Sequence, residues 1–185
     1  MKKIILASKS PRRKELLQLL KIPFEIIAAD IDENIDHDND LVKEIEKLSY
    51  QKAEAVYKNH QEALVIGSDT IVKVGNKALG KPKSYAQAKE MLEMLSGKTH
   101  EVVTGVTILV DDKIDTFSSI AEVTFYELSN DEIEEYIKTN EPMDKAGAYA
   151  IQGDGAKFIK TIKGDYYTIV GLPIGELYHH LKQYI

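Results

Sequence analysis

Three cations follow a short apolar run near the start of the chain. Residues 4–7 predict a buried strand, and Ser10 with Pro11 predicts a helix start, because serine is a favoured N-cap and proline fits the first helical position. Arg12 and Arg13 would lie in the first turn, where free N–H groups and the helix dipole favour a bound anion. The stretch indicates a phosphate site; the alternative is an ordinary capped helix whose arginines lie in solvent or pair with acids.

Carboxylates occupy two places where a divalent cation could bind. One is an acidic loop that holds Asp30, Asp32, Glu33, Asp36, His37, Asp38 and Asp40. Either this loop is simply solvated, or Glu33 or a neighbour is an oxygen ligand for Mg²⁺ or Mn²⁺. The other place is Asp69, which follows the continuous apolar run 63–66. At the tip of a buried strand, Asp69 either binds a divalent ion or orients a water, or it only caps a turn.

Two lysines stand where they could bind phosphate. Lys52 falls on the apolar stripe of a helix expected over 41–59, so that either its stem packs and its ammonium reaches solvent, or the ammonium enters a polar pocket. Lys81 lies between a glycine and a proline, in a constrained loop that is either a phosphate contact or an ordinary turn.

The segment 141–155 is rich in glycine and alanine and has no clear period. Small residues permit close approach of the backbone to a ligand. Gln152 offers a donor and an acceptor, which suits reading the edge of a nucleobase, and Lys145 adds positive charge. The alternative is a glycine-rich connection between elements.

The elements that must position these side chains alternate between strands and helices. Helices are expected over 11–21, 41–59, 84–96, 131–138 and from 173 onward. Strands are expected over 24–28, 63–66, 71–74, 99–110, 114–126, 156–162 and 166–170. Capping boxes are expected at Ser84 with Gln87 and at Ser129 with Glu132.

Composition narrows the function classes. The chain has 185 residues, 43% of them hydrophobic, which suits one domain over 1–185. A net charge of −6 argues against a nucleic-acid polymer as partner. The absence of cysteine excludes disulfides, thiolate ligands and a cysteine nucleophile. No apolar run is long enough for a signal peptide or a membrane span, so we expect a cytoplasmic protein that does not enter the membrane.

Seven short motifs occur in order along nearly the whole chain. They are LASKSPRR (6–13), GSDT (67–70), GKP (80–82), LSGKTH (95–100), EPMDKAGAY (141–149), IQG (151–153) and GLP (171–173). Together they resemble the Maf family of nucleoside triphosphate pyrophosphatases. The resemblance implies an α/β fold similar to inosine triphosphate pyrophosphatase, with a curved mixed sheet in two lobes, flanking helices and a central cleft, commonly as a homodimer. It also implies metal-dependent hydrolysis of a nucleoside triphosphate to the monophosphate and pyrophosphate.

The resemblance also implies roles for individual residues. The phosphate-handling positions of the family match Ser8, Arg12, Arg13, Lys52 and Lys81. Glu33 and Asp69 match the metal-binding and water-activating positions, with Asp69 as proton acceptor. Arg12, Thr70 and Gln152 match the branch that acts on dTTP and UTP rather than on 7-methyl-GTP. Ser10 and Lys145 complete the expected substrate-binding set, and Ser68 departs from an alanine that is frequent in the family.

Two other functions remain open at this point. A nucleotide-binding regulator of septum formation and cell division would need no turnover, although a carboxylate at position 69 would repel a triphosphate that is only bound. A phosphatase or nucleotidyltransferase could use the same cations and would release different products.

Overall fold

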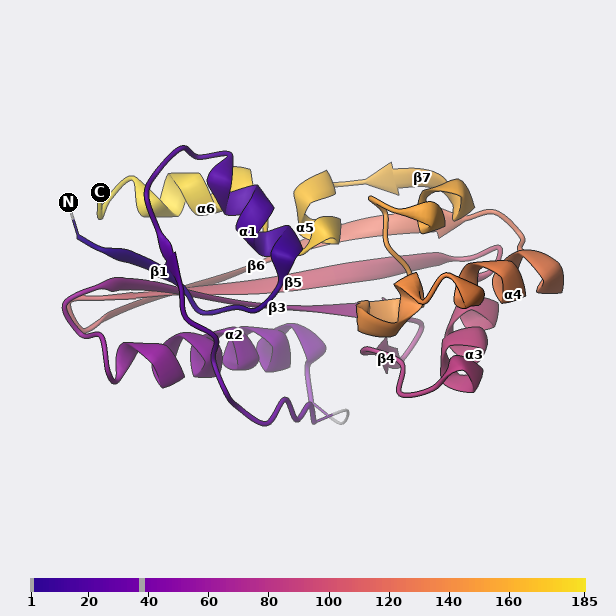
Figure 1. Cartoon of the computed structure of the whole chain (residues 1–185), viewed down its shortest axis with the longest axis horizontal. Coiled ribbons are helices and arrows are strands. Elements are labelled where there is room, and N and C mark those ends of the chain that lie inside the picture. Colours follow the sequence, from indigo (N-terminus) through magenta and orange to yellow (C-terminus); the bar gives the residue numbers. More distant parts are fainter. Residues whose placement is uncertain (1, 37–38) are drawn as a thin grey trace. The chain divides into compact units, whose positions relative to one another are not determined.

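The computed structural model describes residues 2–36 and 39–185 (Figure 1). His37 and Asp38, part of the predicted acidic loop, lie outside the described residues. Within the residues that the structure describes, seven strands form one mixed sheet: β1 (Ile4–Leu6), β2 (Glu25–Ile26), β3 (Leu64–Val74), β4 (Lys77–Leu79), β5 (Thr99–Val110), β6 (Lys113–Phe125) and β7 (Ile159–Lys163). The strand order is β2-β1-β3-β5-β6-β7, with β4 paired to β3. β1 runs parallel to β2 and β3, whereas β3–β4 and β6–β7 are antiparallel. The predicted α/β class with a mixed sheet is confirmed.

Helices follow or connect these strands. The α-helices are α1 (Pro11–Gln18), α2 (Leu41–Tyr57), α3 (Tyr85–Leu95), α4 (Asn130–Lys138), α5 (Tyr166–Val170) and α6 (Ile174–Leu181). Three short 3-10 segments are η1 (Glu141–Asp144), η2 (Ala146–Ala148) and η3 (Asp154–Phe158). Within the described part of the chain, no helix has both the length and the apolar character needed to cross a membrane.

The chain divides into two compact units. Unit 1 consists of Met1–Thr70, Thr104–Ser119 and Gly171–Ile185, and unit 2 of Ile71–Val103 and Ile120–Val170. In unit 1, α2 covers one face of the strands and α1 and α6 cover the other (Figure 1). In unit 2, α3 packs beside α4 over a core built around Phe125, Tyr136 and Phe158. The single domain over 1–185 with a cleft between lobes stays a prediction.

Local signals set most of the helix ends. Ser10 caps α1 with proline following it, and Ser129 and Glu132 form the predicted reciprocal capping box of α4. Ser84 caps α3, but the Gln87 side chain accepts from the backbone N–H of Lys83 instead of closing a box.

Strand predictions are wrong at three places. The strand expected over 156–162 begins only at Ile159, since residues 154–158 form η3. β3 continues unbroken from Leu64 to Val74, so Asp69 lies inside a long strand and not at its tip. The segment 166–170 is the helix α5, not a strand, because the Asp165 carboxylate accepts hydrogen bonds from the N–H groups of Tyr167 and Thr168 at 3.2 and 2.9 Å. Such a cap favours helix over the strand propensity of aromatic and β-branched residues.

Candidate active site

The turn between β1 and α1 brings two serines and two arginines together. The Ser10 hydroxyl accepts a hydrogen bond from the backbone N–H of Arg13, and the backbone N–H of Ser10 donates to the Ser8 hydroxyl at 3.2 Å. Ser8 is buried, while Arg12 and Arg13 are half-buried. The predicted helix start is therefore confirmed, and it places the N-terminus of α1 and the Arg13 side chain beside Ser8.

The Arg13 side chain is held in one orientation. Its Nε donates to the carbonyl oxygen of Gly171 at 2.8 Å, and its Nη2 donates to the Thr70 hydroxyl at 3.0 Å. Nη1 lies 3.5 Å from the Ser8 hydroxyl. Burial lowers the pKa of Arg13 from its ordinary value, and the neighbouring Asp69 acts in the opposite direction. An arginine stays charged despite such a shift, so the site keeps a fixed, preorganised cation.

Close packing of α2 on β3 places Lys52 beside Asp69. A Cβ at Gly67 would lie 2.2 Å from the backbone oxygen of Ser49 and 2.6 Å from the backbone nitrogen of Ala53, so only glycine permits this approach. Lys52 lies between those two α2 residues. Asp69 is two residues beyond Gly67 in the strand and therefore points to the same face. Gly67 therefore lets α2 pack closely enough on β3 for the Lys52 ammonium to reach the Asp69 carboxylate.

The alternation of β3 gives the two faces of the strand different partners. Asp69 meets α2, whereas Ser68 and Thr70 point to the other face, where the Ser68 hydroxyl donates to the Gly171 carbonyl at 3.2 Å. Thr70 shares a hydrogen bond of 2.9 Å with the Thr104 hydroxyl and accepts from Arg13. Residues 68–70 of β3 therefore position both the Asp69 carboxylate and the Arg13 side chain.

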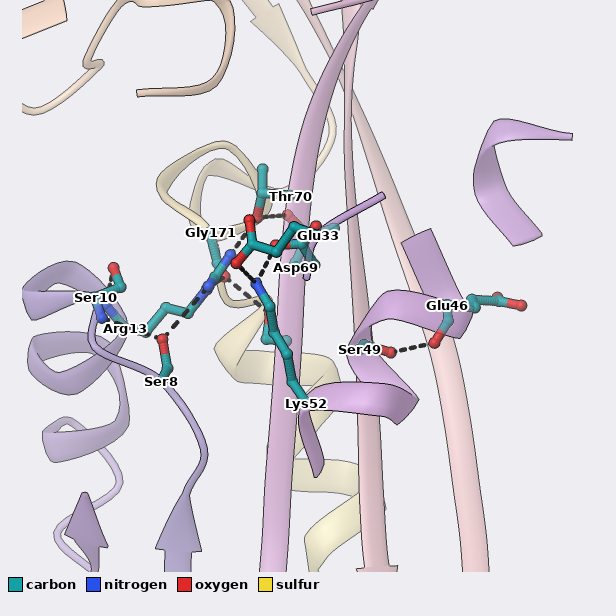
Figure 2. Close-up of polar contacts among 12 residues, drawn as sticks. Ser8, Ser10, Arg13, Glu33, Glu46, Ser49, Lys52, Asp69, Thr70 and Gly171 are labelled. Atoms are coloured by element: carbon teal, nitrogen blue, oxygen red, sulfur yellow. Dashed lines mark hydrogen bonds and ion pairs between the residues drawn. The ribbon is translucent and has the colours of Figure 1, made fainter. Parts of the chain in front are cut away.

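Lys52 lies between two carboxylates. Its Nζ is 2.6 Å from Asp69 Oδ1 and 2.7 Å from Glu33 Oε1. Figure 2 shows the ammonium and the Arg13 guanidinium converging on Glu33 and Asp69 from different helices. The Lys52 side chain is only 8% exposed. Of the two predictions for Lys52, the polar pocket is confirmed and an ammonium that reaches bulk solvent is wrong.

Glu44 holds the acidic loop that carries Glu33. This side chain is buried at the start of α2, where it accepts from the backbone N–H of Asp36 at 3.3 Å and from Asn39 Nδ2 at 3.2 Å. An acid in the first turn of a helix is a common stabilising feature, so its position gave no distinct signal of this role. The Gly171 carbonyl and Thr104 were also missed, because their roles arise only from contacts between distant segments.

The two carboxylates fit a hard divalent cation. Among residues 2–36 and 39–185, no three His, Cys, Asp or Glu side chains gather as a complete metal site. Mg²⁺ does not need one, since it commonly takes one or two carboxylates and fills its other positions with water and substrate phosphate oxygens. Glu33 and Asp69 both reach the same ammonium, so both could reach one cation.

Unit 2 carries the other three predicted residues. Lys81 and Gln152 are exposed, and Lys145 is half-buried with its ammonium bonded to Asp144 and 3.4 Å from the Glu141 carbonyl. The Lys81 turn is tied to the Lys145 segment, because the Gly147 N–H donates to the Gly80 carbonyl at 3.1 Å.

Comparison with known proteins agrees with this arrangement of motifs. A family model described as Maf-like protein matches residues 3–184. A dTTP/UTP pyrophosphatase of Bacillus cytotoxicus is 53% identical over 184 residues, which cover 100% of this chain and 96% of that protein. A dTTP/UTP pyrophosphatase of Bacillus cereus is also 53% identical, over 100% of this chain and 91% of that protein.

Proposed function

Because the chain belongs to the family of Maf-like proteins, we propose that it is a nucleoside triphosphate pyrophosphatase acting on dTTP and UTP. The observation that carries the proposal is the cluster of Arg13 and Lys52 with Glu33 and Asp69 (Figure 2). Two cations next to two carboxylates suit a reaction in which a polyphosphate is held while a water is activated.

The cations bind the triphosphate. With Nε and Nη2 of Arg13 fixed by Gly171 and Thr70, the remaining N–H groups of the guanidinium can donate to phosphate oxygens without rearrangement. The N-terminus of α1, with Ser8 and Ser10, adds further donors. The ammonium of Lys52 is available to a phosphate once another cation neutralises the carboxylates that now hold it.

Asp69 orients and deprotonates the attacking water. The water oxygen bonds to the α-phosphorus, the bond between that phosphorus and the α–β bridging oxygen breaks, and pyrophosphate leaves. The proton passes to Asp69 Oδ, and the same cations stabilise the charge that develops on the leaving group.

Glu33 and Asp69 are the residues that would hold Mg²⁺ or Mn²⁺. When bound, such an ion neutralises the triphosphate and polarises its oxygens. Without such an ion, Glu33 and Asp69 occupy the Lys52 ammonium that a bound triphosphate would need, and this is why a nucleotide-binding regulator without turnover fits the site less well.

Base selection falls to Arg12, Thr70 and Gln152. Support for Gln152, Lys81 and Lys145 comes from the family motifs in which they stand, and Thr70 has a second role in holding Arg13. Modified pyrimidine nucleotides are included in the proposed substrate class. We further propose that the protein is cytoplasmic and that it forms a homodimer. Light scattering of the purified protein would test the dimer.

The decisive assay measures products from a panel of nucleoside triphosphates with Mg²⁺, with Mn²⁺ and with a chelator. Selective release of pyrophosphate from dTTP and UTP supports the proposal. Release of orthophosphate would indicate a phosphatase, and turnover confined to purine or methylated substrates would contradict the base assignment.

Single substitutions test whether the activity depends on the cluster around Asp69. Asp69→Asn should lower kcat by about 10²–10³, as loss of a single well-placed electrostatic group does. Asp111→Asn is the matched control, because Asp111 lies in the exposed turn between β5 and β6 and should retain full activity. Wild-type turnover by Asp69→Asn would refute the role of this carboxylate.

A further inference from the structure

The segment 148–155 of unit 2 is fixed on both sides of Gln152. Before it, the Tyr149 hydroxyl lies 2.8 Å from His100 Nε2, and the Ala150 N–H donates to the Tyr136 hydroxyl at 3.0 Å. Gln152 itself is exposed. A residue that reads a base must be accessible and must project from a fixed backbone, and this segment provides both conditions.

Tyr136 connects the segment to α4 and to Glu141. The side chain is 1% exposed, and burial followed by a hydrogen bond to Glu141 raises its pKa well above the ordinary value. The hydroxyl therefore keeps its proton at neutral pH. It can accept from Ala150 while donating to the Glu141 carboxylate.

Glu141 holds the segment beyond Gln152. Its Oε1 accepts from the N–H of Asp154 at 3.0 Å and its Oε2 accepts from the N–H of Gly155 at 3.1 Å. The packing leaves no room for side chains here, because a Cβ at Gly153 would lie 1.7 Å from Glu141 Oε1 and one at Gly155 would lie 2.8 Å from the Tyr136 hydroxyl. The two glycines therefore allow the carboxylate and the phenol to reach the backbone.

We propose that Tyr136 and Glu141 are positioning residues for base selectivity, which act by fixing the backbone on both sides of Gln152. The inference rests on the proposed role of Gln152 as the residue that reads the base. A short segment bonded on both sides fixes the Cα position of Gln152 and so narrows the region that its amide can reach, whereas a loosened segment lets the amide adapt to the wrong base edge. Displacement of a recognition group by about 1 Å can change rates by about 10².

The test compares UTP with CTP, which differ only at the base edge. Tyr136→Phe removes one hydroxyl, and Glu141→Gln keeps the size of the side chain while removing its charge. Each should lower the ratio of kcat/KM for UTP to that for CTP by about tenfold, with kcat for UTP reduced less than the ratio. Glu135→Gln, at an exposed position of α4, is the matched control and should keep the wild-type ratio.

The variant Gln152→Ala distinguishes failure of the base assignment from failure of the proposed positioning role. If it leaves the UTP/CTP ratio unchanged, Gln152 does not read the base, and both the base assignment and this inference fail. If it lowers the ratio while Tyr136→Phe and Glu141→Gln lower both kcat/KM values equally, or change neither, only the inference fails. If the inference holds, Tyr136→Phe combined with Gln152→Ala lowers the ratio no further than Gln152→Ala alone. Additive effects would contradict it.

Discussion

Replacing Lys52 by methionine should change both stability and the response to a divalent cation. The ion pair with Asp69 joins side chains that are 8% and 12% exposed, whereas Glu33 is 44% exposed. Removing one partner of a buried pair costs about 3–5 kcal/mol. An exposed pair contributes at most about 1 kcal/mol, so Asp69 dominates the expected loss.

The expected loss of stability can be measured as a melting temperature. For a chain of this size, 1 kcal/mol corresponds to about 2–4 °C, so Lys52→Met should lower Tm by about 6–20 °C in a metal-free buffer. In the variant, Mn²⁺ can bind Glu33 and Asp69 without first displacing the Lys52 ammonium. We therefore expect Mn²⁺ to raise Tm more in the variant than in the wild type, and at about tenfold lower concentration.

Lys58→Met, at the C-cap of the same helix, is the matched control. Lys58 pairs with Glu54 at 3.0 Å, but its side chain is 65% exposed, so the variant should lose less than about 1 kcal/mol and keep the wild-type response to Mn²⁺. Equal stabilisation of wild type and Lys52→Met by Mn²⁺ would refute the idea that ammonium and metal compete for the same carboxylates.

Three further outcomes are expected. Burial lowers the pKa of His100 from its ordinary value of 6.5 to about 4. The free energy of unfolding should therefore fall by about 3 kcal/mol as pH drops from about 6.5 to 4, because the unfolded chain binds a proton that the buried imidazole does not. The variant His100→Gln should flatten this dependence, measured by thermal unfolding between pH 7 and 4. Gly67→Ala should lower Tm and abolish activity through overpacking against α2, whereas Gly175→Ala, with nothing within 4 Å of its new Cβ, should leave both unchanged. Glu44→Ala should raise the KM for dTTP several-fold with little change in secondary structure by circular dichroism, and an unchanged KM would show that the acidic loop needs no support from Glu44.

Sequence patterns predicted the elements whose signals are local. Ser10 followed by Pro11 defines the start of α1, and the alternation of apolar residues after Thr99 defines the long strand β5, because capping and periodicity depend on neighbouring residues alone. The segment 166–170 was wrongly predicted as a strand, because the prediction used only the preferences of its own residues. Its residues favour a strand, and the capping carboxylate of Asp165 outweighs that preference.

Contacts between distant segments could not be predicted in the same way. The sequence placed Lys52 on an apolar stripe but left its environment open, since Glu33 and Asp69 approach it only after α2 packs on β3. Glu44, Thr104 and Tyr136 lie outside the motifs that the sequence analysis used, and the motif that begins at Glu141 gave no sign that this carboxylate holds the backbone. Their roles depend on which backbone groups lie nearby in the folded chain.

The central claim is that water attacks the α-phosphorus of a pyrimidine nucleoside triphosphate. Hydrolysis of dTTP in H₂¹⁸O, followed by mass spectrometry of both products, tests this most directly. We predict one ¹⁸O atom in dTMP and none in pyrophosphate. Label in pyrophosphate, or release of orthophosphate with dTDP, would contradict the account.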